Sequence, residues 1–276
     1  TTRVVVLAEG RRYSVDLASF DSSIDADLAR RDFTVDAMAV SLRDALSGQW
    51  KLMDPHGGRV DAQNRTIRAV GSDVFRADPA RMMRAVRLAA SLKFSLDPDT
   101  AALIRRDAGM VLSVSPERVR EELLQTLAEE GARDSVRLLD ELGLLSCVIP
   151  ELDDARGVAQ PKEHHWNVFD HMVESVGYVE QVMGQGPVDE MVTRLLPRFE
   201  GMQEHFANEV TDGHARRTLM KLTGLIHDIG KPATKSIEPS GRMRFFGHAD
   251  EGARIAGVVL RRLRFGRRGV RLATTM

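Results

Sequence analysis

The sequence has almost no cysteine. Cys147 is the one cysteine among 276 residues, which excludes a framework of intrachain disulfides and is typical of a reducing compartment, so we expect a cytoplasmic protein. The sequence contains no run of about 18 apolar residues and no signal-peptide pattern, so we expect no membrane span. The formal net charge of −1 excludes a uniformly basic coat for nucleic acid. Any contact with RNA must therefore come from local clusters of arginine.

A second absence concerns the N-terminus. Residues 1–20 predict two β-strands joined by a Glu9-Gly10 turn, and a two-stranded hairpin is not stable alone. We therefore expect the chain to begin partway through a sheet, with a preceding piece missing from the sequence. Apolar residues make up 43% of the chain and charged residues 29%, which fits a globular protein rich in helix and long enough for two or more domains.

Hydrophobic spacing predicts the elements that follow. Residues 28–40 have the spacing of a helix, with Leu28, Val35 and Met38 on one face. From residue 98 onward the pattern predicts one helix after another, and the polar segment 184–213 is predicted to be an insertion. The other predicted elements are a short strand at 49–54 and three helices. The first helix spans 99–106, the second begins at Ser115 with Pro116 in its first turn, and the third spans 132–142 and ends before Gly143.

The segment 76–90 stands out. Asp78-Pro79 predicts a helix start, with proline at the first helical position. Arg81, Arg84 and Arg87 follow at steps of three, which makes a slowly drifting stripe opposite an apolar face. Three guanidiniums beside a capping carboxylate suit a phosphate-bearing ligand that also has a polar edge to read. The alternative is the solvated basic face of an ordinary amphipathic helix.

Four motifs occur in one order along the first half of the chain. They are Arg30-Arg-Asp-Phe-Thr-Val-Asp-Ala-Met-Ala39, Asp54-Pro-His-Gly-Gly-Arg-Val-Asp61, Ala77-Asp-Pro-Ala-Arg81 and Ser115-Pro-Glu-Arg-Val-Arg-Glu-Glu122. In this order and spacing they resemble the family of bacterial tRNA nucleotidyltransferases (CCA-adding enzymes) and poly(A) polymerases, and the resemblance covers roughly residues 1–150. It implies an α+β protein with part of a nucleotidyltransferase head at 1–70 and a helical neck at 71–150.

The resemblance implies a role for the first motif. Arg31 would contact the nucleotide and Asp32 would discriminate the ribose, the alternative being an ion pair at a helix start. The family usually has Asn where this chain has Asp36. The second motif resembles a hinge that lets the head adjust, although Pro-x-Gly-Gly by itself is only a turn.

The third motif would read the incoming base. Asp78 and Arg81 look like the family's pair that recognises the edge of cytosine or adenine, since a carboxylate accepts and a guanidinium donates without a nucleic-acid template. Arg84 and Arg87 would hold the triphosphate or the base. The family usually has Glu where this chain has Ala77.

The family's reaction is attack of an RNA 3′-hydroxyl on the α-phosphate of ATP or CTP, and it needs two Mg²⁺ ions held by carboxylates. In the family two of these carboxylates come from an Asp-x-Asp strand after a Gly-rich turn, which this sequence lacks. Asp16 is a candidate additional carboxylate, the alternative being an ordinary acid at a strand end. As it stands we expect the chain to bind nucleotide poorly and to transfer nothing, whereas we expect the intact protein to be capable of both. The expected partners are tRNA or another RNA 3′ end, ATP and CTP; the product and the oligomeric state stay open.

Three further motifs occur in order within residues 151–276: His164-His-Trp-Asn-Val-Phe-Asp-His171, Leu225-Ile-His-Asp-Ile-Gly-Lys-Pro232 and Phe246-Gly-His248. This second resemblance is to the HD superfamily of metal-dependent phosphohydrolases. It implies a metal site made by His171, His227, Asp228 and His248, which suits a divalent transition metal such as Mn²⁺ or Ni²⁺. Lys231 would meet a phosphate. The alternative is a set of ordinary core histidines. The competing function is therefore hydrolysis of nucleotides or 2′,3′-cyclic phosphates; a pure RNA-binding scaffold is disfavoured by the low net charge.

Overall fold

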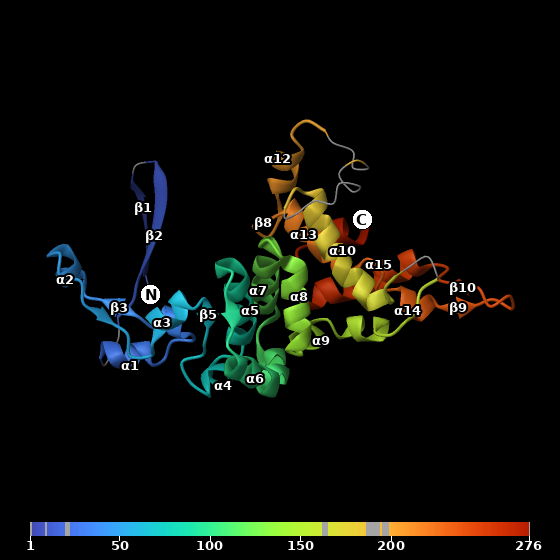
Figure 1. Cartoon of the computed structure of the whole chain (residues 1–276). Helices are drawn as coiled ribbons and strands as arrows, with labels where there is room; N and C mark the ends of the chain where they lie inside the picture. The colour runs from blue at the N-terminus through green and yellow to red at the C-terminus, as the bar shows by residue number, and fades with distance from the viewer. Residues whose placement is uncertain are drawn as a thin grey trace. The chain divides into compact units, whose positions relative to one another are not determined.

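The computed structural model describes residues 2–8, 10–19, 23–161, 165–185, 194 and 199–275. The chain divides into two compact units, residues 1–64 with 68–74, and residues 65–67 with 75–276. The first contains short strands and short helices, and the second is mostly helical (Figure 1), which confirms the α+β expectation. Among the described residues, no helix is both long and apolar enough to cross a bilayer. The finer division at residues 70 and 150 stays a prediction.

The predicted hairpin is present in the first unit. Strand β1 (Thr2–Ala8) pairs antiparallel with β2 (Arg11–Leu17), and Thr2 lies opposite Leu17. Gly10 has a φ of +72°, a conformation that glycine adopts without steric cost. The apolar residues of both strands stay exposed; Val5 retains 43% of its accessible surface and Leu7 79%.

The helix predicted at 28–40 is wrong. Helix α1 (Ile24–Leu28) ends where that prediction begins, and a 3₁₀ turn, η1 (Thr34–Asp36), follows. Phe33 is fully buried and forms an antiparallel bridge with Ala69, while the N–H of Thr34 donates to the carbonyl of Arg68. Long-range backbone pairing therefore outweighs the local helical spacing. The unit continues with β3 (Ala39–Val40), α2 (Leu42–Leu46), β4 (Leu52–Met53) and α3 (Gly58–Gln63).

The Pro-His-Gly-Gly motif fixes α3 against η1. The carboxylate of Asp54 accepts the backbone N–H of Gly58 at 2.7 Å. A Cβ on Gly58 would lie 2.0 Å from the carbonyl oxygen of Thr34, so only glycine permits this approach. Buried Asp61 accepts the Thr34 hydroxyl at 2.7 Å. These bonds hold the first and second motifs of the sequence together.

The first half of the second unit confirms the predicted helices to within one or two residues. Helix α5 packs against α7 and α8, and its buried face includes Met82, Ala85 and Val86, as the spacing predicts. The helix begins at Ala80, with Pro79 as its N-cap residue and not its first helical position. The elements are α4 (Val74–Ala77), α5 (Ala80–Leu92), α6 (Pro98–Asp107), α7 (Pro116–Ala128), α8 (Ala132–Glu141), α9 (Leu144–Val148), a short parallel pair β5 (Thr66–Ile67) and β6 (Ser95–Leu96), and 3₁₀ turns η2 (Ala108–Ser113) and η3 (Pro150–Ala155).

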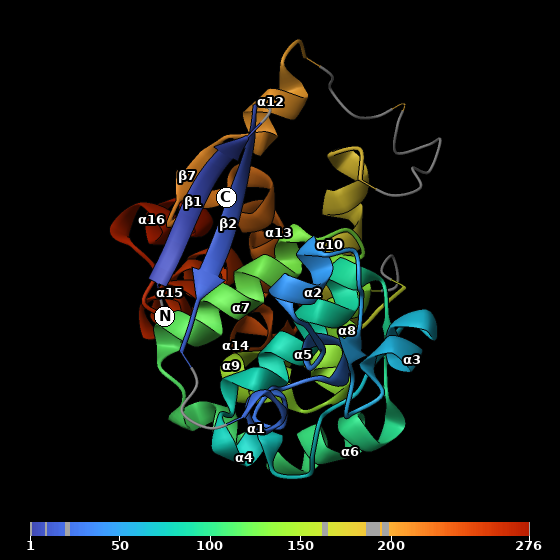
Figure 2. The same cartoon turned by 90° about the vertical axis from the view of Figure 1, so that its left-hand side faces the viewer.

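The second half of this unit packs around α10 and α13, which contact each other and the helices before them (Figure 2). Helix α15 lies against α14 and α16. The predicted insertion at 184–213 lies partly outside the described residues. The elements are α10 (Val168–Val182), α12 (Met202–Ala207), β7 (Glu209–Thr211), β8 (His214–Ala215), α13 (Arg216–Ile226), α14 (Lys231–Thr234), β9 (Ser236–Ile237), β10 (Met243–Arg244), α15 (His248–Arg262) and α16 (Arg267–Thr275).

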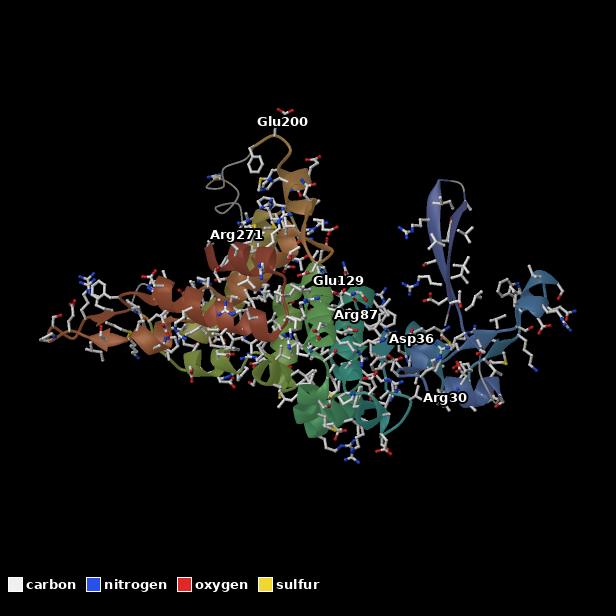
Figure 3. The ribbon with its side chains drawn as sticks, turned by 180° about the vertical axis from the view of Figure 1, so that it is seen from behind. Arg30, Asp36, Arg87, Glu129, Glu200 and Arg271 are labelled. Carbon is white, nitrogen blue, oxygen red and sulfur yellow. The ribbon has the colours of Figure 1, made fainter. Side chains whose placement is uncertain are left out.

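A buried lysine joins three of these helices. Lys221 of α13 has no accessible surface, and its Nζ lies 2.9 Å from Oε1 of Glu180 on α10. The same ammonium donates at 2.8 Å to the carbonyl of Glu129, which follows α7 (Figure 3). Glu180 also accepts the N–H of Ala132 at the start of α8. Burial lowers the pKa of Lys221 although Glu180 opposes the shift, so this pair is a structural connection that depends on both partners.

Candidate functional site

The Arg31 and Asp32 side chains lie in the first unit, and each contacts a different neighbour. The guanidinium of Arg31 lies 3.1 Å from the carboxylate of Asp27, which also pairs with Arg30 at 3.2 Å. Hydrogen bonds from Arg31 and Arg30 lower the pKa of Asp27. Asp32 accepts the N–H of Phe33. More than half of the Arg31 side chain stays accessible, so it can reach a ligand.

Asp16 lies on the exposed hairpin and faces a guanidinium. Its two carboxylate oxygens accept from Arg3 across the strand pair, at 2.6 and 2.8 Å. The hydrogen bond from Arg3 lowers the pKa of the Asp16 carboxyl. The cation would have to move aside before this carboxylate could hold a metal ion. The role of Asp16 as a catalytic carboxylate stays a prediction.

In the second unit, Asp78 joins the third motif to the fourth. Its Oδ1 accepts the N–H of Ala80, which satisfies one of the donors at the start of α5. Its Oδ2 accepts from Arg118 of α7 at 2.8 Å. Burial raises the pKa of Asp78, but the hydrogen bond and charge of Arg118 outweigh it and the pKa is lowered overall. The carboxylate is therefore held ionised, as an acceptor.

The arginine stripe on α5 is not a solvated face. Arg87 retains only 18% of its side-chain surface and lies 2.6 Å from Glu122 of α7, and Figure 3 labels it on α5. Arg81 and Arg84 are half-buried, and the charge of Arg81 acts on the Asp78 carboxyl. Helix α5 therefore carries Arg81, Arg84 and Arg87, and Asp78 lies two residues before its start. The other candidates, Asp16, Arg31 and Asp32, belong to the other unit.

The three histidines among the predicted metal ligands gather around the fourth, Asp228. Donor atoms of His171 on α10, and of His227 and Asp228 after α13, all lie within 4.8 Å of one another. Oδ2 of Asp228 is 3.4 Å from Nε2 of His171 and 3.2 Å from Nε2 of His227. His248, the first residue of α15, lies further out, with its Nε2 3.9 Å from Oδ1 of Asp228.

The backbone orients these imidazoles. The Nδ1–H groups of His227 and His248 donate to the carbonyls of Gly224 and Phe245, at 2.9 and 2.7 Å. In the neutral rings both Nε2 atoms are thus left as acceptors or ligands. Nε2 of His227 faces Nε2 of His171 at 3.3 Å. Two imidazoles and a carboxylate that converge in this way fit a divalent transition metal.

Asp228 is buried and carries much of the charge of this cluster. Burial raises its pKa, and the hydrogen bonds of His227 and Lys231 together lower it well below the usual range. Burial lowers the pKa of His227, and the Asp228 carboxylate raises it overall. Nζ of Lys231 lies 2.7 Å from Oδ2 of Asp228 and 2.7 Å from Oε1 of Gln160. Lys231, expected to meet a phosphate, is in contact with the cluster itself.

One glycine lets the elements of the cluster meet. A Cβ on Gly230 would lie 2.4 Å from the nitrogen of Gly252 and 2.4 Å from the carbonyl oxygen of His248. A Cβ on Gly252 would make only an ordinary contact, 3.5 Å from the carbonyl oxygen of His227. The start of α15 therefore packs directly on the backbone that follows Asp228, and this contact brings His248 to the cluster.

Three contacting residues were missed by sequence reasoning. Arg118 and Glu122 lie one helical turn apart within the fourth motif, so the sequence could have indicated that they share a helix face. Nothing in the pattern indicated that they contact Asp78 and Arg87. Gln160, which contacts Lys231, precedes α10 without any motif of its own.

Comparison with known proteins agrees with the first resemblance. Residues 2–68 match the family model of the poly(A) polymerase head domain, and residues 93–156 match that of the probable RNA- and SrmB-binding site of polymerase A. The chain is 33% identical to an A-adding tRNA nucleotidyltransferase of Deinococcus radiodurans, over 95% of this chain and 53% of the relative. It is 34% identical to a multifunctional CCA protein of Paracidovorax citrulli, over 92% of this chain and 52% of the relative.

Solved structures agree in fold. The structure titled "tRNA-processing enzyme (apo form 2)" matches with a TM-score of 0.61 and 18% identity, over 99% of this chain and 63% of that one. This chain spans about half the length of the curated relatives that it matches. The two family models cover segments on both sides of α5, and the relatives extend across nearly the whole chain. The chain therefore carries segments that match the head and RNA-binding domains of poly(A) polymerases, and it is similar along most of its length to tRNA nucleotidyltransferases.

Proposed function

We propose that the protein is an RNA 3′-terminal nucleotidyltransferase that adds CMP and AMP from CTP and ATP to tRNA 3′ ends without a template. The observation that carries this proposal is the ionised Asp78 beside Arg81 at the start of α5, held by Arg118 of α7. The names of the relatives, which include A-adding and multifunctional CCA enzymes, support the same reaction class.

The chemistry of these side chains suits selection of a base. Cytosine and adenine both present an exocyclic amine beside a ring nitrogen, which is a donor next to an acceptor. The Asp78 carboxylate accepts from the amine, and the Arg81 guanidinium donates to the ring nitrogen. Arg118 keeps Asp78 ionised and fixes its orientation, so the protein itself plays the part of a template.

Nucleotidyl transfer in this family depends on divalent metal, and Mg²⁺ is the ion we propose. Two-metal chemistry requires several converging carboxylates. Asp16, the candidate in the first unit, faces Arg3 and belongs to no group of three or more potential metal ligands among the described residues. The described residues of this unit by themselves therefore do not fit a two-metal site.

The charge distribution supports an RNA partner. Residues 252–276 contain seven arginines and no acidic residue, although the whole chain has a net charge of −1. Arg267, Arg268 and Arg271 are exposed on α16, where Figure 3 labels Arg271. A concentrated basic surface on a chain that is acidic elsewhere favours contact with phosphates.

The test uses the protein expressed from its complete reading frame and a tRNA that lacks its 3′-terminal nucleotides. Labelled CTP and ATP should be incorporated in the presence of Mg²⁺, and Arg81→Ala should reduce incorporation. Arg105→Ala, which alters an exposed arginine on α6 that caps a carbonyl of α8, is the matched control. No incorporation, or an Arg81→Ala variant equal to the wild type, would reject the proposal.

The cluster of His171, His227 and Asp228 favours a second candidate function on the same chain, a metal-dependent phosphohydrolase acting on nucleotides or 2′,3′-cyclic phosphates. A bound Mn²⁺ or Ni²⁺ would polarise a phosphoester and activate water. The chain's own residues orient the imidazoles and, through Lys231, balance the charge of Asp228. Hydrolysis of a 2′,3′-cyclic nucleotide that needs divalent metal and disappears in His227→Ala supports this function; metal-independent hydrolysis contradicts it.

A further inference from the structure

A second cavity adjoins the histidine cluster. The first, of about 370 Å³, contains His227, Asp228 and His248. The second, of about 840 Å³, lies between Gln160, the β9–β10 hairpin and the start of α15, and His248 lines it as well. His248 thus lines both cavities. A ligand that occupies the larger cavity reaches the imidazole that faces Asp228.

The larger cavity has a lining of cations and aromatic rings. Lys231, Arg242 and Arg244 supply positive charge, and Phe245 and Phe246 supply rings, while none of the lining residues that the structure describes is acidic. Glu238 lies beside it and holds Arg244 at 2.9 Å. A volume of this size is within the ordinary range of small-molecule sites.

Phe246 is the unusual residue of this lining. It retains 73% of its accessible surface, so it contributes little to any core. The guanidinium of Arg244 lies 5.5 Å from the centre of its ring. The carboxylate of Glu238, which directly follows β9, accepts a hydrogen bond from that guanidinium and fixes it. An exposed ring beside a positioned arginine is an arrangement on which a nucleobase can stack.

We propose that this cavity is a base-binding subsite: a nucleotide places its base on Phe246 and Arg244 and its phosphate toward His248 and the histidine cluster. The proposal rests on the second candidate function, because it assigns a substrate class to that site. Lys231 lies at the junction, in contact with Asp228 and 5.6 Å from the Phe245 ring. A free nucleotide and the end of a single-stranded RNA share this chemistry.

The experiment measures binding by calorimetry in the presence of Mn²⁺, with 5′-AMP, ribose 5-phosphate and a short oligoadenylate ending in a 3′-phosphate. All variants carry Arg81→Ala, so that binding to the first proposed nucleotide site is weakened. AMP should bind about 5- to 150-fold more tightly than ribose 5-phosphate, the range expected for one stacked base. Phe246→Ala should abolish this difference and leave the affinity for ribose 5-phosphate unchanged.

Phe199→Ala, which removes another exposed ring, is the matched control and should keep the preference for AMP. Equal binding of AMP and ribose 5-phosphate, or a preference that survives Phe246→Ala, overturns the subsite while leaving the metal cluster intact. A base preference lost in Phe246→Ala without any binding of Mn²⁺ supports the subsite and rejects the phosphohydrolase. Tighter binding of the oligoadenylate than of AMP identifies an RNA end as the occupant, and equal binding identifies a free nucleotide.

Discussion

Arg118 of α7 donates to the carboxylate of Asp78 at 2.8 Å, across forty residues of sequence. The pair connects the motif proposed to select the base with the helix-start motif of the next segment. Arg87 and Glu122 make a second connection between the same two helices. The segment proposed to read the base is therefore held in place by α7.

Loss of Arg118 should impair nucleotide selection. Arg118→Ala removes the hydrogen bond that lowers the pKa of Asp78, so we expect incorporation to fall by about 10- to 100-fold, the value of a hydrogen bond to a charged group. The acidic limb of the profile of incorporation against pH should also move to higher pH, because Asp78 then protonates more readily. Incorporation measured across pH tests both effects. Arg118→Lys should restore part of the activity, and an unchanged pH profile in Arg118→Ala would contradict this role.

The buried lysine should be essential for stability. Lys221→Met leaves Glu180 buried without its cation, so we expect a loss of about 3–5 kcal/mol in the free energy of unfolding. The exposed pair Lys93–Glu130, with 74% and 57% of its side chains accessible, provides the control: Lys93→Met should cost less than about 1 kcal/mol. Denaturant unfolding measures both. Lys221→Met with Glu180→Gln should recover part of the loss; equal effects of the two single lysine variants would contradict the prediction.

Acid should weaken the contact between η3 and α15. Both carboxylate oxygens of Glu151 accept from Arg262, at 2.6 and 2.8 Å, and this hydrogen bond lowers the pKa of Glu151. A lowered folded-state pKa contributes stability above the unfolded value of about 4.3, and that contribution is lost as pH falls through the folded pKa. The difference in melting temperature between wild type and Arg262→Ala should therefore shrink below about pH 4. Arg268→Ala should show no such change.

The basic face of α16 should set the salt dependence of RNA binding. Changing Arg267, Arg268 and Arg271 together to alanine should lower the slope of log affinity against log salt by about 2–3, because each phosphate contact contributes close to one. Fluorescence anisotropy with labelled tRNA at several salt concentrations gives the slope. Arg254→Ala, which alters an arginine paired with Glu251 on α15, is the control; an unchanged slope in the triple variant would exclude this surface.

Divalent metal should bind at the histidine cluster. His227→Ala removes a donor that lies within 4.8 Å of the other two, so affinity for Mn²⁺ should fall by at least about 10-fold. His205 on α12 lies outside the cluster, and His205→Ala should bind as the wild type does. Elemental analysis and calorimetric titration with Mn²⁺ distinguish the variants. Equal affinities in all three proteins would show that the metal binds elsewhere.

The local sequence pattern predicted most of the helices and the hairpin. This is because hydrophobic periodicity and helix caps, such as those at Ser115 and Gly143, depend on residues only a few positions apart. It failed at 28–40, where Phe33 pairs with Ala69 and the helical spacing is overridden. Ordered motifs located the Asp78 helix and the histidine cluster. They did not reveal that Asp16 faces Arg3 or that Asp78 faces Arg118, because such partners depend on how distant segments pack.

The contact between Gly230 and Gly252 has a consequence for how this protein tolerates change. At this point two backbones meet with no side chain between them, so rotamer adjustments in the surrounding core do not alter their separation. Substitutions at buried positions of α15 such as Val259 can thus lower stability and leave the imidazole of His248 where it is. The backbone contact therefore keeps the geometry of the cluster independent of side-chain packing elsewhere in the core. It is lost where Gly230 gains a methyl group, whereas a methyl group on Gly252 would meet only ordinary van der Waals contacts.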